Sequence, residues 1–466
     1  RRLLLADART LVRVALPLIL TNCLFYGQNI TDAMVLGHVR EQAGVPPGTY
    51  LAANTVFMVY ASSTFMLAQC VTFALDTLVS QAAGAKSMRV VGVLLQNALL
   101  LVTLAAVPVG VAWFFTEQVL LLAHIDAHVA RHAGLLARVQ AVSLLPSLWY
   151  RALNRWLTAQ QHTRPAFVAG IAGFVLNIVL NFLFVFGVGL GFVGSPIATS
   201  VSRFAQPLLL WAYMYWRRLH RPAWQHGWQW REAVSPRRLW TMLRFGAPAG
   251  GSVFLEVLSF ESMSLFIGVC CAANVVGGHG VAFSLLFVAF FLPLGVCIAI
   301  SARIGELLGQ GRAVHAEAVS HIAVLLSGSC VVLMAAALYA LRNVLPYVYT
   351  LDPVIVLPAS SFLFLAAALA LVDGLQATGL AILRGAGRPK VGLAASLTGY
   401  FVIAIPIELS LAFATGLHSF GVWLGMIIGV SFIALVVNLI IVRRLDWHAL
   451  AVEARARAAD VPRGGG

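Results

Sequence analysis

Residues 90–115 read VVGVLLQNALLLVTLAAVPVGVAWFF, an apolar stretch without a charged side chain. A helix needs about 20 apolar residues to cross the hydrocarbon core of a bilayer, so this stretch is long enough to span it. Eleven further apolar runs fill most of the chain. Together the twelve cover residues 12–37, 52–81, 90–115, 131–158, 165–190, 194–216, 239–271, 278–308, 315–341, 353–383, 391–415 and 421–442. The sequence therefore predicts an all-α membrane protein with twelve transmembrane helices.

The composition of the 466 residues agrees with this prediction. The chain is 60% hydrophobic and 10% charged, whereas soluble proteins average about 45–50% and about 25%. Twelve spans leave no room for a sizeable soluble domain, which excludes a water-soluble enzyme. The six cysteines lie inside apolar runs without C-x-x-C spacing, so we interpret them as small buried hydrophobic residues. They are Cys23, Cys70, Cys270, Cys271, Cys297 and Cys330.

The basic residues indicate the orientation in the membrane. In a twelve-span topology, 26 of the 31 Lys and Arg residues fall at the termini or in the connectors on the same side. The other five are Arg40, Arg131, Arg138, Arg203 and Arg342. Cytoplasmic connectors carry the excess of basic residues, so both termini are expected in the cytoplasm. The net charge of +14 then reflects topology and contact with membrane lipid, and we expect no nucleic-acid partner.

The longest polar connector, RRLHRPAWQHGWQWREAVSPRR at 217–238, lies in the middle of the chain. Its tryptophans and arginines suit the cytoplasmic membrane interface. We therefore predict an N-lobe over 1–216 with six helices, a cytoplasmic linker over 217–238, a C-lobe over 239–445 with six helices, and a cytoplasmic tail over 446–466.

Four landmarks recur in the two halves at nearly constant spacing. They are Pro17 and Gly37 with Pro248 and Gly268, Gly84 with Gly309, Arg164-Pro165 with Arg388-Pro389, and Gly194 with Gly421. Their offsets of 231, 225, 224 and 227 residues agree to within seven, which predicts an internal duplication. Repeats of six spans each have the same orientation, so a pseudo-two-fold axis along the membrane normal relates them. Transporters built from two like halves bind substrate between them.

Six carboxylates lie well inside predicted spans, where a charge is costly and therefore a candidate for function. They are Asp32, Asp76, Glu256, Glu261, Asp373 and Glu408. Glu261, Asp373 and Asp32 lie at or above mid-depth, so we predict that they bind the coupling ion or the substrate. Such a carboxyl can hold either a proton or a cation, and that mutual exclusion is antiport.

Two further pairs complete the predicted site. Asn177 and Asn181 are four residues apart and share a helix face, where they either line a polar cavity or bond across helices. Pro17 and Pro248, early in matched spans, are possible hinges, although membrane helices generally tolerate proline.

Other motifs argue against catalysis and metal binding. His124, His128 and His132 recur at zinc-compatible spacing, but we interpret them as the solvated face of a connector, because the one further candidate ligand nearby, Asp126, points away from the centre of that face. No G-x-x-x-x-G-K-[ST] loop is present, so ATP does not drive the chain directly. We therefore expect no catalytic residues, no metal site and no cofactor, and a coupling ion that is H⁺ or, alternatively, Na⁺.

Over residues 8–445 the chain resembles the multidrug and toxic compound extrusion (MATE) family, especially its eukaryotic organic-cation branch. In the N-terminal half the resemblance rests on ALPLILTN (15–22), TDAMVLGH (31–38), ALDTLVSQAAGAK (74–86), TAQQHTRP (158–165) and NIVLNFLFVFG (177–187). In the C-terminal half it rests on FGAPAG (245–250), LEVLSFESMSLFIG (255–268) and ILRGAGRPKVG (382–392).

The resemblance implies a two-lobed antiporter with a V-shaped cleft that exports organic cations against proton or sodium flow. It assigns essential roles to Glu261 and Asp373, and in bacterial members to the position of Asp32 with Asn177 and Asn181. Ser284 stands where the family has another glutamate, which puts part of the cation-binding network in doubt.

Alternatives remain open at this point. Sodium-coupled multidrug efflux uses the same residues, and a flippase for lipid-linked substrates has a related fold but needs cationic groups in its cavity, of which Arg203 is the main one. The major facilitator class expects an acidic G-x-x-x-D-R motif, absent from GAKSMRVVG at 84–92. We expect a monomer in the plasma membrane or an acidic organelle membrane, acting on small-molecule organic cations.

Overall fold

The computed structural model describes residues 2–39, 45, 46, 48–224 and 227–459, and every regular element within these ranges is helical. The first half of the chain contains α1 (Arg2–Gly37), α2 (Thr49–Gln69), η1 (Cys70–Phe73), α3 (Ala74–Gly84), α4 (Met88–Phe114), α5 (Thr116–Leu122), α6 (Ala127–Ala159), α7 (Arg164–Phe182), η2 (Leu183–Gly187), η3 (Gly191–Val193), α8 (Gly194–Trp216) and α9 (Trp230–Ala233). The second half contains α10 (Pro236–Cys270), α11 (Ala273–Gly309), α12 (Ala313–Ala340), η4 (Leu345–Val348), α13 (Pro353–Gly385), α14 (Pro389–Leu397), η5 (Thr398–Ala404), α15 (Ile405–Leu409), η6 (Ser410–Ala414), α16 (His418–Arg444) and α17 (Trp447–Ala459).

Ten helical segments of the described chain are long and apolar enough to cross a membrane. Two more helices, α6 and α8, have 33 and 23 residues but are more polar. Four arginines lie along α6, and α8 carries Arg203 among serines, threonine and glutamine. With these two, twelve helices of spanning length correspond to the twelve predicted runs, so the prediction of an all-α multi-pass membrane protein is confirmed.

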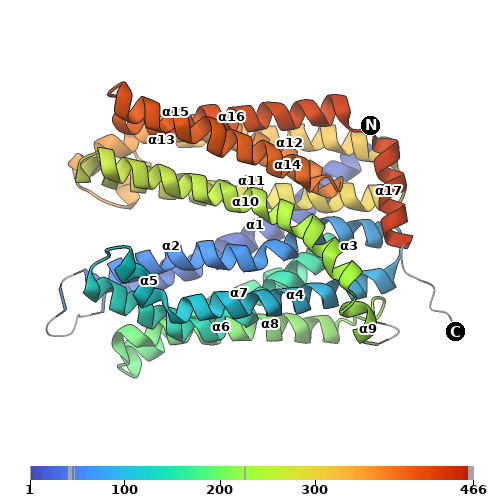
Figure 1. Ribbon diagram of the computed structural model, residues 1–466, viewed down its shortest axis with the longest axis horizontal. Coiled ribbons are helices and arrows are strands. Elements are labelled where there is room, and N and C mark those ends of the chain that lie inside the picture. Colours follow the sequence, from blue (N-terminus) through green and yellow to red (C-terminus); the bar gives the residue numbers. More distant parts are fainter. Residues whose placement is uncertain (1, 40–44, 47, 225–226, 460–466) are drawn as a thin grey trace. The chain divides into compact units, whose positions relative to one another are not determined.

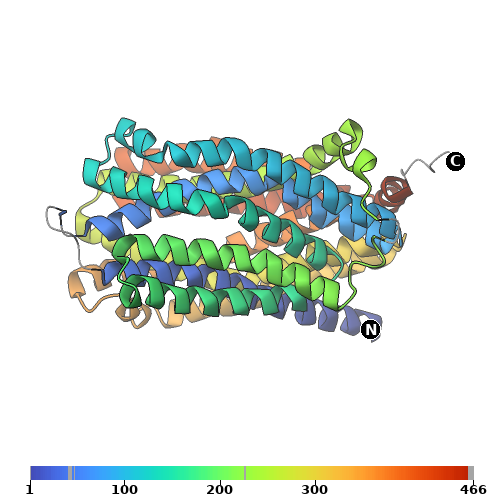
Figure 2. The same cartoon turned by 90° about the horizontal axis from the view of Figure 1, so that it is seen from below.

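Packing divides the chain into two units that do not follow the predicted halves at every point. Packing unit 1 comprises residues 1–19, 76–87 and 251–466, and packing unit 2 comprises 20–75 and 88–250. Within unit 1, α13 packs against α11, α12 and α16; within unit 2, α6 packs against α2, α4 and α8. In each unit the long helices run alongside one another (Figure 1, Figure 2). The lobe boundaries expected from the repeat remain a prediction.

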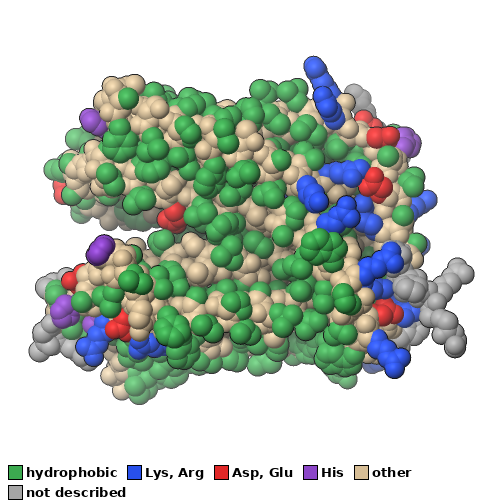
Figure 3. Space-filling view, viewed as in Figure 1, with side chains coloured by type: hydrophobic (Ala, Val, Ile, Leu, Met, Phe, Trp, Pro, Cys, Tyr) green, Lys and Arg blue, Asp and Glu red, His purple; other side chains and the backbone are tan. Residues whose placement is uncertain are grey.

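Each unit has its own apolar core. The core of unit 1 includes Phe362 and Trp423, and that of unit 2 includes Phe57 and Trp113. Large hydrophobic side chains also cover the helix flanks on the face drawn in Figure 3, and Lys and Arg side chains gather toward helix ends. Such exposed residues, for example Leu333 at 71%, are suited to lipid rather than water. Arg1, Arg40 and Arg463, included in the charge count above, lie outside the described residues.

The matched glycines Gly84 and Gly309 occur where two helices of unit 1 approach closely. A Cβ added to Gly84 would collide with the backbone oxygen of Glu306, and one added to Gly309 would collide with the backbone oxygen of Gln81. The ends of α3 and α11 therefore pack through these glycines, because no larger side chain fits between the backbones. This contact gives a physical reason for one landmark of the repeat.

The central connector is anchored within unit 2. Glu232 of α9 forms ion pairs with Arg89 and Arg238. The side-chain amide of Asn97 donates a 2.6 Å hydrogen bond to the carbonyl of Ala233, which closes α9 onto α4. Trp224 of the connector stacks near Trp156, with ring centroids 6.4 Å apart.

The predicted tail contains a helix, α17, that packs within unit 1. Asp446 caps it by accepting hydrogen bonds from the backbone N–H groups of His448 and Ala449, both at 3.0 Å, as an N-cap aspartate does. Its apolar face buries Trp447 and Leu450. Arg388 donates to Glu453 at 2.7 Å, so α17 is fastened beside the start of α14.

Candidate functional site

Unit 2 contains a buried carboxylate surrounded by hydrogen-bond donors. Asp32 of α1 is 2% exposed. Its Oδ2 accepts a 2.6 Å hydrogen bond from the Thr199 hydroxyl of α8. Its Oδ1 accepts from the amides of Asn181 at 2.9 Å and Asn177 at 3.4 Å, both on α7. The structure thus brings together three residues predicted from the sequence, Asp32, Asn177 and Asn181, and adds Thr199.

The Asp32 cluster also presents oxygen atoms that have no partner. The side-chain oxygens Oδ1 of Asn177 and Asn181 are buried and accept no hydrogen bond from the described residues. Carboxylate, amide and hydroxyl oxygens are the ligands that hard cations prefer. The cluster is therefore chemically suited to hold a proton on Asp32 or a small cation among these oxygens. Arg203 of α8 is the cation that interacts electrostatically with Asp32.

Unit 1 contains a second buried acid, Asp373 of α13, which is 4% exposed. The side-chain amide of Gln376 donates to Asp373 Oδ1 at 3.2 Å and to the hydroxyl oxygen of Tyr400 at 2.6 Å. Glu256 of α10 is close enough to Asp373 to interact with it electrostatically, and Arg384 interacts with Glu256. Two carboxyl groups, one buried and one half-buried, thus share a polar region with one half-buried guanidinium group.

The two glutamates of α10 take different positions. Glu261 is half-buried and makes no hydrogen bond within the described part of the chain. Glu256, five residues earlier, is the glutamate that faces Asp373. Five residues turn a helix by about 140°, so the two side chains point in different directions. Sequence alone could place both glutamates at depth but could not show which one faces α13.

Ser284 occupies the position where the resemblance implies a glutamate. This α11 residue lies beside Tyr349, in the connector after α12. Burial raises the pKa of Tyr349, and the hydrogen bond with the Ser284 hydroxyl opposes part of that rise. The position thus carries a neutral hydroxyl contact in this chain.

The two remaining acids differ in their surroundings. Asp76 lies in the first turn of α3 and is 6% exposed. Glu408 is fully buried in α15 between two π-helical segments, η5 and η6, and neither of its carboxyl oxygens is hydrogen-bonded among the described residues. Its side chain packs against Gly425 of α16. Glu408 lies two residues after Pro406, which indicates a kink, and the π-helical segments are the local irregularity found there.

Pro17 and Pro248 each lie inside a helix that belongs to both packing units. In α1 the chain passes from unit 1 to unit 2 after Ile19, and in α10 it passes from unit 2 to unit 1 after Gly250. Each passage follows the proline by two residues. The hinge role of Pro17 and Pro248 remains a prediction.

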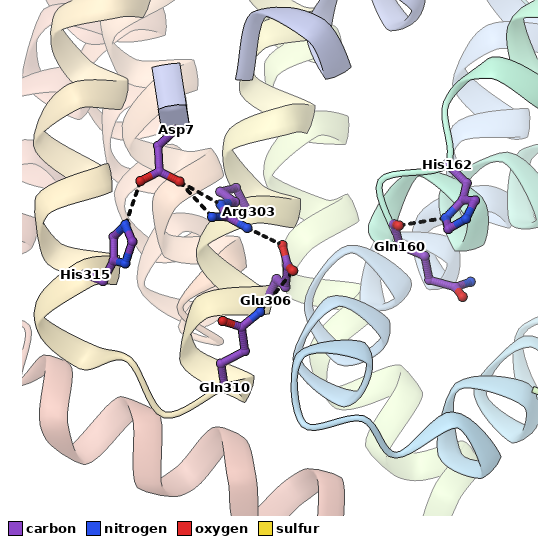
Figure 4. A network of polar contacts seen from close by, with 7 residues as sticks. All are labelled: Asp7, Gln160, His162, Arg303, Glu306, Gln310 and His315. Atoms are coloured by element: carbon purple, nitrogen blue, oxygen red, sulfur yellow. Dashed lines mark hydrogen bonds and ion pairs between the residues drawn. The ribbon is translucent and has the colours of Figure 1, made fainter. Parts of the chain in front are cut away.

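A charged network that the sequence did not reveal joins three helices of unit 1 (Figure 4). Asp7 of α1 accepts hydrogen bonds from Arg303 of α11 and from His315 of α12. Arg303 also donates to Glu306 at 2.8 Å. Asp7 precedes the first apolar run, and nothing in its neighbourhood in the sequence indicates a partner some 300 residues away.

The histidines singled out by spacing are placed around the start of α6. Asp126 caps this helix by accepting hydrogen bonds from the backbone N–H groups of His128 at 2.9 Å and Val129 at 3.2 Å. The His132 ring packs against Tyr50 and Phe192, with centroids 5.1 and 5.3 Å away. Asp126 thus has a capping role.

Comparison with known proteins bears on this arrangement. The MatE family model matches residues 17–183 and 248–409, and the two stretches begin at the matched prolines Pro17 and Pro248. The chain is 32% identical to multidrug and toxin extrusion protein 2 of Mus musculus, over 97% of this chain and 77% of that protein. It is 28% identical to protein DETOXIFICATION 17 of Arabidopsis thaliana, over 95% of this chain and 90% of that protein. Among solved structures, that of the eukaryotic MATE transporter AtDTX14 superposes with a TM-score of 0.89 at 26% identity, covering 98% of this chain and 99% of that one.

Proposed function

Because this chain belongs to the MatE family of multidrug and toxin extrusion transporters, we propose that it is an antiporter that exports organic cations in exchange for protons. Its relatives support multidrug efflux, and its apolar helices make it an integral multi-pass membrane protein. It is a transporter and not an enzyme. Proton coupling and the class of substrate are the proposed parts.

The observation that carries the proposal is the acid pair of half-buried Glu256 and buried Asp373, with which Arg384 is the one cation found to interact among the described residues. An unpaired carboxylate inside the membrane is costly, and one guanidinium can balance only one of the two charges. The second carboxyl is neutralised when it binds a proton or when a cationic substrate replaces that proton. The two ligands exclude one another, so export of a cation is coupled to entry of a proton.

The hydrogen bonds around Asp373 suit this exchange. Gln376 joins the carboxylate of Asp373 to the hydroxyl of Tyr400, so loading or release of a proton can rearrange one connected set of polar groups. Glu261, half-buried on the same helix as Glu256, remains the candidate for contact with substrate. Asp32 with its asparagines is the corresponding candidate in unit 2.

Sodium coupling is the second candidate, and a specific observation favours it. The oxygens of Asp32 and the unpartnered Oδ1 atoms of Asn177 and Asn181 form a set that fits a hard monovalent cation. In that case Asp32 and not Asp373 would hold the coupling ion. Transport of lipid-linked anions receives less support, because the buried charges of unit 1 are mainly acidic.

The test is uptake of a radiolabelled quaternary ammonium cation into proteoliposomes under an imposed pH gradient, with and without sodium. Wild type is compared with Asp373→Asn and Asp32→Asn. The matched control is Asp352→Asn, which alters a capping aspartate at the start of the same helix α13. We expect sodium-independent uptake that Asp373→Asn abolishes and Asp352→Asn retains.

Uptake that requires sodium and is lost in Asp32→Asn would show that the coupling ion is sodium and not the proton. Uptake that depends neither on the pH gradient nor on sodium would contradict the proposed role of the unit 1 acids. Full activity in Asp373→Asn would contradict it as well.

A further inference from the structure

Two cysteines that are adjacent in the sequence lie at the turn between α10 and α11. Cys270 is the last residue of α10, and Cys271 directly follows it. Their Sγ atoms are 3.3 Å apart, so one thiol donates a hydrogen bond to the other. Both residues are half-buried, whereas the sequence predicted buried cysteines. Among the described residues they are the one pair of cysteines whose sulfur atoms are in contact.

A cavity of about 470 Å³ lies beside the two thiols within unit 1. Its walls come from the turn between α10 and α11 and from the turn that precedes α16, and they include Cys270, Cys271, Val275, Leu417, His418 and Phe420. Gly416 and His418 have positive φ angles of 73° and 45°, so the chain turns sharply before α16. The volume lies in the range of small-molecule sites, about 300–1,000 Å³. The cavity can therefore hold a small organic group next to the two sulfur atoms.

The number and spacing of the sulfur atoms limit what the pair can bind. Thiolates prefer soft ions, but a structural zinc ion takes four ligands, and no group of three His, Cys, Asp or Glu residues in the described part of the chain could hold a metal ion. A linear two-coordinate ion needs its sulfurs on opposite sides, whereas these two lie side by side. Trivalent arsenic forms three bonds on one side of a lone pair. In an aryl arsenical one of these bonds goes to carbon, so two neighbouring thiols complete the set.

We propose that Cys270 and Cys271 form a binding site for trivalent aryl arsenicals, with the aryl group in the adjoining cavity. The reaction of an arylarsenic(III) oxide with the two thiols is a condensation. Two As–S bonds form, the bond between arsenic and the oxide oxygen breaks, and both thiol protons leave with that oxygen as one water molecule. Arsenic stays trivalent, so no oxidant or reductant is needed. Val275, Leu417 and Phe420 provide apolar contact for the ring.

The test is the binding of phenylarsine oxide to the full chain purified in lipid nanodiscs. The protein is first reduced with a phosphine and desalted, and the adduct is counted by intact-protein mass spectrometry. An arsenical held by two sulfurs of one chain resists excess monothiol such as 2-mercaptoethanol, whereas a dithiol such as 2,3-dimercaptopropanol removes it. We expect one arsenical per chain after the monothiol wash and none after the dithiol wash.

Cys270→Ser and Cys271→Ser each leave one thiol of the pair. In wild type the second As–S bond forms within one molecule, which strengthens binding by about 10²–10⁴-fold. Each variant should therefore bind at least about 100-fold more weakly, measured as the monothiol concentration that removes half of the adduct. Cys330→Ser is the matched control, because Cys330 is half-buried on α12 of the same unit, and it should retain the adduct as wild type does. Arsenite lacks the aryl group that fills the cavity, so it should bind more weakly than phenylarsine oxide.

Loss of the adduct from wild type in the monothiol wash would overturn the proposal, as would an adduct that both single variants retain. Equal binding of arsenite and phenylarsine oxide would refute the role of the cavity. If a serine variant does not fold, the two washes of wild-type protein, with peptide mapping of the retained arsenical, decide the matter, and an arsenical mapped to other cysteines overturns the site. The measurement is of binding alone, so its outcome does not depend on the proposed export function.

Discussion

Replacing Asp7 with alanine should detach the first turns of α1 from α11 and α12 within unit 1. The Asp7 carboxylate is the common acceptor of the network: Oδ1 accepts from Arg303 Nε at 3.2 Å and Nη2 at 2.7 Å, and Oδ2 accepts from His315 Nε2 at 2.6 Å (Figure 4). Alanine removes all three hydrogen bonds at once. It leaves Arg303 with Glu306 as its remaining carboxylate partner.

The magnitude follows from burial. The Asp7 side chain is 4% exposed, and those of Arg303 and His315 are 18% and 20% exposed. Breaking a buried ion pair costs about 3–5 kcal/mol when the other charge is left alone. Arg303 retains Glu306, and solvent reaches both donors, so we expect a loss of about 2–3 kcal/mol. At the unfolding entropy of globular proteins, a chain of 466 residues would lose roughly 2–3 °C in Tm.

The pH dependence gives an independent check. Burial raises the pKa of Asp7, but hydrogen bonds from His315 and Arg303 outweigh it and hold the pKa below its ordinary value. A carboxyl with a lowered folded-state pKa stabilises the fold above its unfolded pKa of about 3.9, and that contribution is lost as the pH falls through the folded value. The difference in stability between wild type and Asp7→Ala should therefore be full near neutral pH and shrink below about pH 4.

The assay is thermal unfolding of detergent-solubilised protein, followed by size-exclusion chromatography with fluorescence detection, at several pH values. Glu317→Gln serves as the control, because Glu317 is exposed on the same helix as His315, and it should leave Tm unchanged. A cycle with His315→Ala measures the share of that contact. If Asp7→Ala unfolds at the wild-type temperature, or if its deficit persists undiminished in acid, the reasoning from this network is wrong.

Three further predictions concern packing and motion. Gly84→Ala should destabilise the protein by about 1–3 kcal/mol, because the added Cβ would collide with the backbone of Glu306. Gly268→Ala is the control: nothing lies within 4 Å of its Cβ, so it should be neutral or slightly stabilising. The Tm values of the two variants are compared. Glu408→Met should raise stability by about 1–3 kcal/mol, since a buried carboxyl that no described residue hydrogen-bonds is replaced by an apolar side chain of similar length. A lower Tm would reveal a partner for Glu408. Pro17→Ala combined with Pro248→Ala should slow cation uptake severalfold while Tm is kept or raised, and unimpaired uptake would remove both prolines from the transport cycle.

The sequence predicted the membrane-spanning helices well. A span requires a minimum length and apolarity, and both can be counted directly from the residues. The same criteria missed α17, because this helix is too short and too charged for a span. Its apolar residues nevertheless follow helical spacing, namely Trp447, Leu450, Ala451 and Ala454. These criteria also made α6 and α8 look ordinary, although their arginines distinguish them from the other ten spanning helices.

Only part of the site could be predicted from the sequence, and the reason is geometric. Position along a span can be read from the sequence, so Asp32 and Asp373 could be recognised as deep acids, and the spacing of Asn177 and Asn181 put both on one face. Rotation of a helix about its own axis relative to its neighbours cannot be read in the same way. For that reason Thr199 was missed as a donor to Asp32, and the sequence could not indicate that Glu256 is the glutamate of α10 that interacts with Asp373.

The packing units give a physical reason to expect a hinge role for Pro17 and Pro248. Had each half of the chain packed only with itself, each unit would be one continuous segment. Instead α1 and α10 each contribute one end to each unit. The chain also passes between the units after Leu75 and after Ser87, so α1 and α10 provide two of the four passages, and each of these two has a proline beside the passage. Proline lacks the N–H that would bond to the carbonyl four residues earlier, so bending costs least near Pro17 and Pro248, where the helices pass between units.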